Sequence, residues 1–267
     1  MKKLQQSIDL TAAIIAHKLD QKLWKAMESV SWCPIILVID TSAIKNKKDL
    51  KEFREKAKNT FSEIDIYEHA TKVNHFSVMR NSALRHIDTT WTLFLDSDEW
   101  VTSELKNEIL SAISKSTVEA FRIPRTDFFL GKEMLHGETA SISLIRLGQT
   151  HKGMWKGSAH EVWSFDGEVG DISSAIHHEP HDSIGEFIGK VNAYTSILAE
   201  EKNEKGQTTS IFEMITYPIG KFLQNFFLKL GFLDGWRGLI YALLMSFHSF
   251  FMRVKLWEMQ NTNRMVK

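Results

Sequence analysis

The stretch that decides the fold runs from Trp91 to Glu99 and has the sequence WTLFLDSDE. Its first five residues are apolar or β-favouring, which is the pattern of a buried strand. The segment that follows, residues 101–105 (VTSEL), has the pattern of a helix start. The three carboxylates therefore come at the carboxyl end of a strand, which is where open α/β sheets bind their ligands.

Two of these carboxylates, Asp96 and Asp98, are two residues apart. Side chains at that spacing lean the same way in extended backbone, so both can share one hard cation with a diphosphate oxygen. The spacing predicts a site for a metal ion and a nucleotide. The alternative is that one aspartate caps the following helix while the others are solvated.

Composition limits the classes of protein to which the chain can belong. Of its 267 residues 43% are apolar, which is enough for one large α/β domain and an appendage. Lysine plus arginine equals aspartate plus glutamate, at 33 each, so we expect no nucleic-acid partner. The single cysteine, Cys33, excludes an internal disulfide and fits a reducing compartment. Asp9 and His17 bracket the apolar run near the N-terminus, so we expect no secretory signal.

Apolar runs and helical patterns alternate along the first hundred residues. We expect strands at residues 10–16, 35–39, 64–67 and 91–95, separated by helices. This alternation predicts a parallel sheet that is wound right-handedly. From residue 119 the apolar runs are short and bounded by turn residues, which indicates antiparallel strands added to the sheet edge. Helical spacing returns between residues 182 and 201, and the polar segment 202–209 is the candidate linker.

The C-terminal part is unusually aromatic beyond Ser210. Lys221, Asn225 and Lys229 recur at four-residue intervals, which predicts a helix with a thin polar line and a broad apolar face. The run 238–252 carries no formal charge but is shorter than a membrane-spanning helix needs. We expect these helices to lie in the interface of an anionic membrane, helped by nearby basic residues. The alternative is that they pack on the domain or on a second subunit.

Short segments in a fixed order add a more specific pattern along nearly the whole chain. They are residues 76–84 (FSVMRNSAL), 91–99, 129–132 (FLGK), 136–137 (HG), 160–161 (HE), His178, 231–238 (GFLDGWRG) and 255–258 (KLWE). Together they resemble glycosyltransferase family 2, and in particular the inverting sugar transferases of the lipopolysaccharide-core glucosyltransferase type. Any one segment is weakly specific, whereas the ordered set is strongly specific.

The resemblance implies the GT-A fold, an α/β fold with a mixed, mainly parallel sheet flanked by helices. We expect a GT-A domain of residues 1–205 and a C-terminal amphipathic, aromatic helical region of residues 206–267. The resemblance also implies a divalent cation, Mg²⁺ or Mn²⁺, a nucleotide-sugar donor and transfer with inversion. The acceptor would be a lipopolysaccharide-core, capsule or other lipid-linked glycan, and the protein would lie peripherally on the cytoplasmic face of the cell membrane.

The resemblance further implies roles for particular residues. Asp98 would be a metal ligand, Asp96 would contact the ribose or the metal, and Asp40 would contact the nucleobase. Arg80 and Asn81 fall in the donor-binding segment, with Arg80 near the diphosphate. These roles agree with simple chemistry, since Mg²⁺ and Mn²⁺ prefer carboxylate and phosphate oxygens and neutralise the departing diphosphate.

Two further residues each have two interpretations. His178 would be a third, softer metal ligand, compatible with Mn²⁺, or a histidine with a structural role. Glu161 follows His160 and would deprotonate the acceptor hydroxyl as a general base, or would accept hydrogen bonds from loop amides.

The sequence departs from the family pattern in two places. On the nucleoside side, residues 16–19 are AHKL where the family has TYNE, and residues 41–45 are TSAIK where it has SGSTD, so no preference for uridine is predicted. Ile142 replaces the aspartate of the family's Trp-x-x-Asp segment, and its side chain cannot take a proton. Either Glu161 or Glu138 then acts as the base, or the chain is a non-catalytic GT-A scaffold that binds a nucleotide sugar or a partner transferase. A nucleotidyltransferase is a third hypothesis, but the first strand lacks a glycine-rich phosphate loop.

Overall fold

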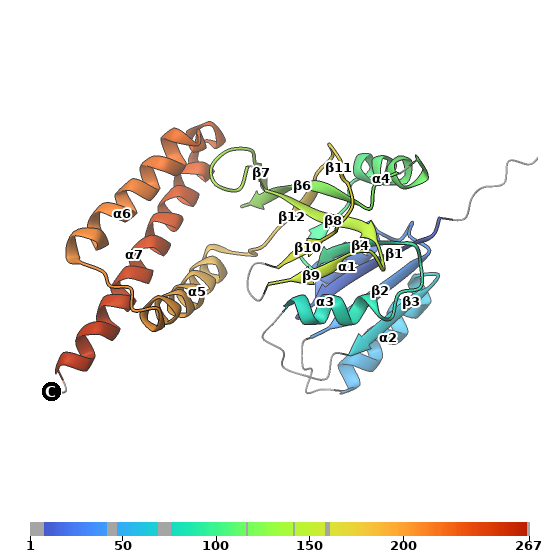
Figure 1. Cartoon of the computed structure of the whole chain (residues 1–267), viewed down its shortest axis with the longest axis horizontal. Coiled ribbons are helices and arrows are strands. Elements are labelled where there is room, and N and C mark those ends of the chain that lie inside the picture. The colour runs from blue at the N-terminus through green and yellow to red at the C-terminus, as the bar shows by residue number, and fades with distance from the viewer. Residues whose placement is uncertain are drawn as a thin grey trace, which may run out of the picture. The chain divides into compact units, whose positions relative to one another are not determined.

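The computed structural model describes residues 8–41, 47–68, 76–115, 117–140, 142–157 and 161–265. Contacts divide the chain into two compact units. Unit 1 consists of Met1–Arg125 and Ile142–His178, and unit 2 consists of Thr126–Ser141 and Glu179–Lys267. Unit 1 is built on a mixed sheet flanked by helices, and unit 2 is mainly helical (Figure 1). The predicted α/β class is therefore confirmed, as is the helical C-terminal extension.

The centre of unit 1 is a run of four parallel strands in the order β3-β2-β1-β4. The strands are β1 (Leu10–Ala16), β2 (Ile35–Asp40), β3 (Ile64–Glu68) and β4 (Trp91–Asp96). The helices that connect and follow them are α1 (Gln21–Ser29), α2 (Lys47–Thr60), α3 (Phe76–Leu84) and α4 (Ser103–Lys115). The four strands predicted from the apolar runs are all present.

Residues of β1 alternate between two apolar cores. Ala12 and Ile14 pack in one core with residues of α1, α2 and α4. Ala13 and Ile15 pack in the other with α3 and two tryptophans from the β9–β10 hairpin (Met154–Lys156 and Val162–Ser164). Side chains of a strand point alternately to its two faces, so a strand covered on both faces must be apolar throughout. The parallel strands are thereby fixed in place up to their carboxyl ends.

Antiparallel strands extend the sheet beyond β4, as expected. Strand β8 (Ser143–Gln149) pairs antiparallel with both β4 and β6 (Ala120–Phe129), and β7 (Lys132–Met134) pairs antiparallel with β6. Strand β11 (Val169–Asp171) pairs with β6 in parallel. Strand β5 (Glu99–Trp100) pairs with β12 (Ile176–His178). Strand β6 begins in unit 1 and ends in unit 2.

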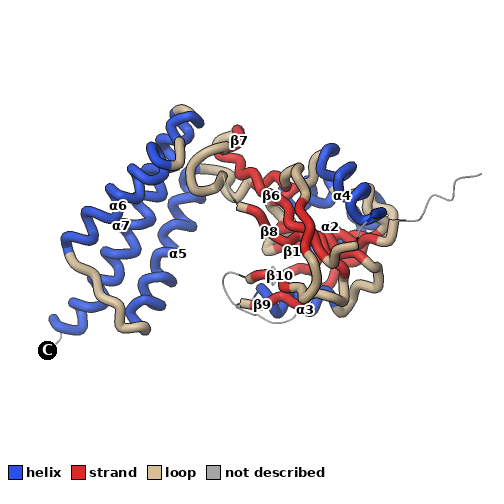
Figure 2. The backbone as a smooth tube through the Cα atoms, turned by 45° about the horizontal axis from the view of Figure 1, so that its top comes forward, coloured by secondary structure: helices blue, strands red, loops and turns tan. Residues whose placement is uncertain are grey.

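Unit 2 is formed by α5 (Ile184–Glu204), α6 (Ile211–Leu223), the π-helical turn η1 (Gln224–Leu228), the 3-10 turn η2 (Gly231–Asp234) and α7 (Trp236–Met265). Helix α7 packs against α5 and α6, and Figure 2 shows the three helices side by side. Phe187 and Val191 of α5 share a core with Leu244 of α7. This packing places α5 in unit 2 with α6 and α7.

The turn between α6 and α7 depends on two glycines. A Cβ added to Gly238 would lie 1.8 Å from the carbonyl oxygen of Gly231, and one added to Gly231 would lie 2.6 Å from that of Asn225. Both positions therefore exclude any side chain. Next to this turn, the Asp234 carboxylate accepts hydrogen bonds from the backbone and ring nitrogens of His136. The GFLDGWRG segment thus has a structural explanation within unit 2.

Helix α7 corrects one expectation about length. It has 30 residues, because it continues through the charged positions that end the run 238–252. In the described part of the chain it is the one helix, over Trp236–Asn261, that is long and apolar enough to cross a membrane by length and composition, with 17% of its most apolar window buried. Core helices of soluble proteins meet the same criterion, so length alone neither establishes nor excludes a span.

Candidate functional site

The carboxyl ends of β1, β2 and β4 form one edge of the sheet. The register places Asp40 opposite Ala16 on one side of β1, and Asp96 opposite Ile15 on the other. Two strand spacings separate β2 from β4, so the backbones of Asp40 and Asp96 lie on the order of 10 Å apart. Asp40 is buried, whereas one third of the Asp96 side chain is exposed. The two predicted donor-binding aspartates thus flank the end of β1.

Asp96 is held by two arginines. Arg80 of α3 donates a hydrogen bond from Nη2 to Oδ1 at 2.6 Å, and Arg146 of β8 donates from Nη2 to Oδ2 at 2.7 Å. Both arginine side chains are buried, with 3% and 6% of their surface exposed. Charge-assisted bonds of this length are among the strongest hydrogen bonds in proteins. Both carboxylate oxygens of Asp96 are therefore already engaged.

Glu99 completes this cluster from the turn after β4. Its side chain is fully buried and accepts from Arg146 Nη2 at 2.9 Å through Oε1, and from the backbone nitrogen of Asp96 at 2.9 Å through Oε2. Arg125 Nη1 lies 3.9 Å from Oε1. Neither Arg146 nor the role of Glu99 was predicted from the sequence. The available signal was a charged residue within the otherwise uncharged strand SLIRLGQ.

The cluster shifts the acidity of its two carboxyl groups in opposite directions. Burial alone would raise the pKa of Asp96, but the charges of Arg146 and Arg80 outweigh it and hold that pKa below its ordinary value. Burial raises the pKa of Glu99, against the opposing charge of Arg146 and with the help of the Asp96 charge. Asp96 thus stays ionised beside the arginines, whereas ionised Glu99 depends on Arg146.

Asp98 and His178 face each other at 3.6 Å, measured from Oδ2 to Nε2. The pairing of β5 with β12, which sets His178 opposite Glu99, brings them together. The described ranges hold no group of three or more histidine, cysteine, aspartate or glutamate side chains suited to a metal ion. A cation here would have two protein ligands, which suits Mg²⁺ or Mn²⁺, since Mg²⁺ commonly takes one or two carboxylates plus phosphate oxygens and water. The donor set fits the predicted cation, with Asp98 better placed than Asp96.

Glu161 lies on the other side of Arg80. Its Oε1 is 3.4 Å from Arg80 Nε, and 16% of its side chain is exposed. His160 lies outside the described residues. Arg80 thus connects the carboxylate of Asp96 with that of Glu161. Because the Arg80 side chain is almost fully buried, its visible role is to position these two acids.

Asn81 makes its hydrogen bonds to the β9–β10 hairpin. Its amide nitrogen donates to the carbonyl oxygen of Trp155, and its amide oxygen accepts from the nitrogen of Trp155, both at 2.9 Å. The ring of Trp155 in turn lies 4.5 Å from the guanidinium carbon of Arg80. The contacts seen for Asn81 therefore fix the hairpin that leads to Glu161, and its predicted contact with the donor stays a prediction.

Glu138, the second candidate base, lies in unit 2. Its carboxylate forms an ion pair with Lys221 and accepts a hydrogen bond from Asn225 Nδ2 at 3.1 Å. Ile142 lies in unit 1, where its carbonyl oxygen accepts from the backbone nitrogen of Arg125 at 2.9 Å. Glu138 and Glu161 are thus each paired with a basic side chain, and the choice between them as base stays a prediction.

Comparison with known proteins adds independent information. No family model matches the chain. The chain is 25% identical over 258 residues to the lipopolysaccharide core biosynthesis glycosyltransferase LpsC of Rhizobium meliloti, a match that covers 89% of this chain and 90% of LpsC. It is 23% identical over 189 residues to an uncharacterized glycosyltransferase of Rickettsia typhi, covering 66% of this chain and 65% of that protein, less than two thirds of its length. Among solved structures, TarS 1–349 of S. aureus is 12% identical, with a TM-score of 0.48 over 96% of this chain and 91% of that one.

Proposed function

On the premise that the chain resembles glycosyltransferases, including one of lipopolysaccharide core biosynthesis, we propose that it is a metal-dependent, inverting glycosyltransferase. It would move a sugar from a nucleotide-sugar donor to a lipopolysaccharide-core, capsule or other lipid-linked glycan. The observation that carries the proposal is the sheet edge where Asp40, Asp96 and Asp98 come together at the ends of β2 and β4. Such an edge is the usual ligand site of open α/β sheets.

The donor would lie along this edge with its base toward Asp40. The separation of Asp40 from Asp96, on the order of 10 Å, suits the span of a nucleoside. Asp96 would accept hydrogen bonds from the ribose, since its exposed third faces solvent while Arg80 and Arg146 hold its charge in place. A rigid, ionised acceptor loses no orientation freedom when the donor binds.

The cation would be held by Asp98 and His178, with diphosphate oxygens and water completing its shell. When bound, it would neutralise the charge that develops on the departing diphosphate. Glu161 would take the proton from the acceptor hydroxyl, and Arg80 would fix its orientation. Asp40 and Asp96 would hold the nucleoside while the sugar is transferred.

Asp98→Asn is expected to weaken cation-dependent binding of a nucleoside diphosphate by about 10-fold to 100-fold or more, because it removes the charge of a metal ligand. Isothermal titration with Mn²⁺ and with chelator measures this effect. Asp166→Asn, an exposed change in the loop after β10, is the matched control and should have no effect. Equal affinity with and without Mn²⁺, unaltered by Asp98→Asn, would contradict the metal site.

We also propose that unit 2 binds peripherally to the cytoplasmic face of the cell membrane. Most exposed large apolar side chains of the described residues lie in this unit, including Phe212 and Leu228, which are 74% and 79% exposed. Many exposed apolar side chains in one unit are typical of an interaction surface. Its helical form fits a bilayer interface.

Charge contributes less to this surface than the sequence indicates. Lys221 pairs with Glu138, and Arg237 Nε donates to the carbonyl oxygen of Leu130 at 3.1 Å. Lys255 Nζ lies within hydrogen-bond distance of four oxygens of α5, enough to use all three of its N–H donors. These three cations are used within unit 2, so we expect apolar contact to dominate membrane binding.

Phe212→Asp is expected to lower binding to anionic liposomes about tenfold or more, because an inserted phenyl ring contributes roughly 1.5–3 kcal/mol. The change should not impair folding, since aspartate is favourable in the first turn of a helix. Met154→Asp, at a 60% exposed position of unit 1, is the control. Sedimentation with liposomes gives the bound fraction. Resistance of the membrane-bound chain to alkaline carbonate would instead indicate that α7 spans the bilayer.

A further inference from the structure

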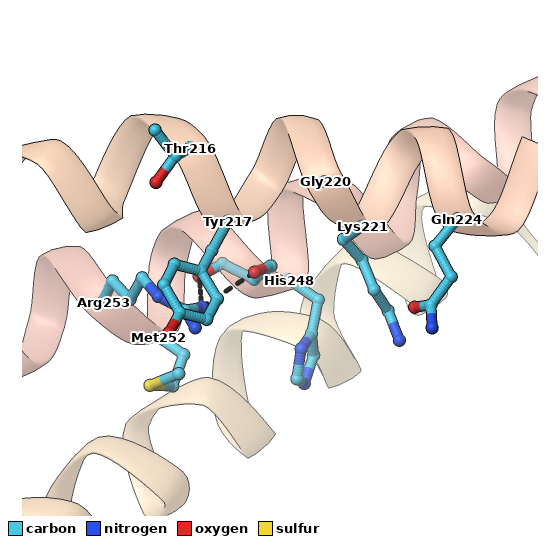
Figure 3. A pocket seen from close by; sticks show the side chains of 9 residues that line it. Thr216, Tyr217, Gly220, Lys221, Gln224, His248, Met252 and Arg253 are labelled. Carbon is cyan, nitrogen blue, oxygen red and sulfur yellow. Dashed lines mark hydrogen bonds between the residues drawn. The ribbon is translucent and has the colours of Figure 1, made fainter.

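Unit 2 contains a cavity of about 560 Å³ between α6 and α7. Its lining is mainly apolar but includes the charged side chains of Lys221 and Arg253. Figure 3 shows side chains from both helices reaching into the same region. The residues that matter here are Tyr217, Gly220, Lys221 and Gln224 on one side, and His248 and Arg253 on the other.

Arg253 is the cation of this cavity that lacks a carboxylate partner. Its Nη1 donates to the carbonyl oxygen and Oγ of Ser249 at 3.0 and 2.8 Å, and its guanidinium carbon lies 3.8 Å from the ring centroid of Tyr217. Within the described ranges no carboxylate lies within ion-pair distance of Arg253. The Tyr217 side chain also forms a hydrogen bond with Arg253. Arginine has five N–H donors, so some remain for a ligand. Partial burial lowers its pKa, as expected for a cation that has lost water.

Lys221 adds a second cation to the same wall. Its partner is Glu138, so the pair is neutral by itself. His248 is half-buried, and burial lowers its pKa, so its ring is neutral at pH 7 and can donate one hydrogen bond. Arg253 is therefore the cation of the cavity wall that forms no ion pair with a described residue, and it has several neutral donors around it, while the charge of Glu213 in α6 acts on it from farther away. A phosphate group, with several acceptor oxygens, matches this set.

Gly220 leaves space in the cavity because it has no side chain. It lies inside α6, where glycine is less favourable than alanine. A Cβ added there would meet no atom within 4 Å, so packing within the protein does not require glycine. The missing side chain leaves the wall of the cavity open beside Lys221 and Gln224.

The surroundings indicate what carries the phosphate. Ile219 and Leu223 adjoin the cavity residues in the sequence of α6, and Phe247 and Phe250 adjoin those of α7. All four are exposed. We propose that the cavity binds the phosphate group of an anionic lipid, whose acyl chains lie on this apolar surface. This site is separate in chemistry from the nucleotide-sugar site and does not rest on the transferase function.

The test uses the full chain and decyl phosphate below its micelle concentration, with binding measured by isothermal titration. Gly220→Leu fills the cavity while raising helix propensity, and Arg253→Gln removes the unpaired charge. Each is expected to weaken decyl phosphate binding at least about tenfold. The matched controls are Gly189→Leu, at a glycine of α5 that also has no atom near its Cβ position, and Lys229→Gln, an exposed charge. Neither control should change the affinity.

Inorganic phosphate and decyl maltoside identify which part of the ligand is recognised. Both should bind at least about tenfold more weakly than decyl phosphate. Inorganic phosphate that binds as tightly as decyl phosphate would overturn the lipid assignment in favour of a free anion site. Decyl phosphate binding that survives both Gly220→Leu and Arg253→Gln would overturn the site itself. Nucleoside diphosphate binding by Gly220→Leu should equal that of the parent, which keeps this test separate from the proposed function.

Discussion

Replacing Arg146 by methionine is expected to lower the free energy of unfolding by about 3–5 kcal/mol, because it removes the closest counter-charge of the fully buried Glu99 and one of the two arginines that bind Asp96. Arg146 binds Asp96 at 2.7 Å and Glu99 at 2.9 Å, and the Glu99 side chain has no exposed surface. Urea unfolding followed by tryptophan fluorescence measures the loss. Arg122→Met is the matched control. Arg122 pairs with Asp171 at 3.1 Å while both side chains are largely exposed, so that change should cost less than about 1 kcal/mol.

The pH dependence of the Arg146→Met variant provides a second measurement. Glu99 already has a raised pKa, and losing Arg146 raises that pKa further. Its folded state then binds a proton that the unfolded state releases, so stability should increase as pH falls from 7 toward 5. Adding Glu99→Gln to this variant should recover part of the lost unfolding free energy at pH 7 and should make the stability less dependent on pH. Equal losses of unfolding free energy in Arg146→Met and Arg122→Met would show that the buried ion pairs of Arg146 stabilise the fold no more than an exposed ion pair does.

Much of the sheet could be predicted because its signals are local. Strands β1, β2 and β4 are apolar runs, each with a helical pattern after it, and WTLFLDSDE marks both a buried strand and the edge where it ends. Arg146 escaped prediction because it lies 50 residues after Asp96 and reaches it only through the antiparallel pairing of β8 with β4. Sequence periodicity indicates that a segment is a strand, but not which strand lies beside it.

In unit 2, too, the sequence did not indicate which helices pack against each other. A polar segment at 202–209 predicted a boundary there, yet the apolar face of α5 packs on α7 across that segment. Arg253 and Lys255 seemed to end the apolar run of α7. Both instead bind oxygens within unit 2, so the helix continues past them. The uncharged run and the helix therefore end at different residues.

Glu161→Gln is expected to lower sugar transfer by a factor of about 10²–10⁴ while leaving donor affinity within about twofold. Glutamine keeps the volume of glutamate and an oxygen that can accept from Arg80 Nε, which lies 3.4 Å from the carboxylate. It cannot take a proton from the acceptor hydroxyl. Turnover would be followed with a panel of nucleotide sugars and lipid-linked glycans, and donor binding by titration of the nucleoside diphosphate.

Glu138→Gln is the informative comparison, because Glu138 is the other candidate base and pairs with Lys221 in unit 2. It should loosen that pair and leave turnover largely intact. Loss of turnover in Glu138→Gln with normal turnover in Glu161→Gln would reverse the assignment. A parent chain that binds nucleotide but neither transfers nor hydrolyses any donor would favour the scaffold hypothesis. In that case the replacement of the family's aspartate by Ile142 would mean that catalysis has been lost, and not that another residue acts as the base.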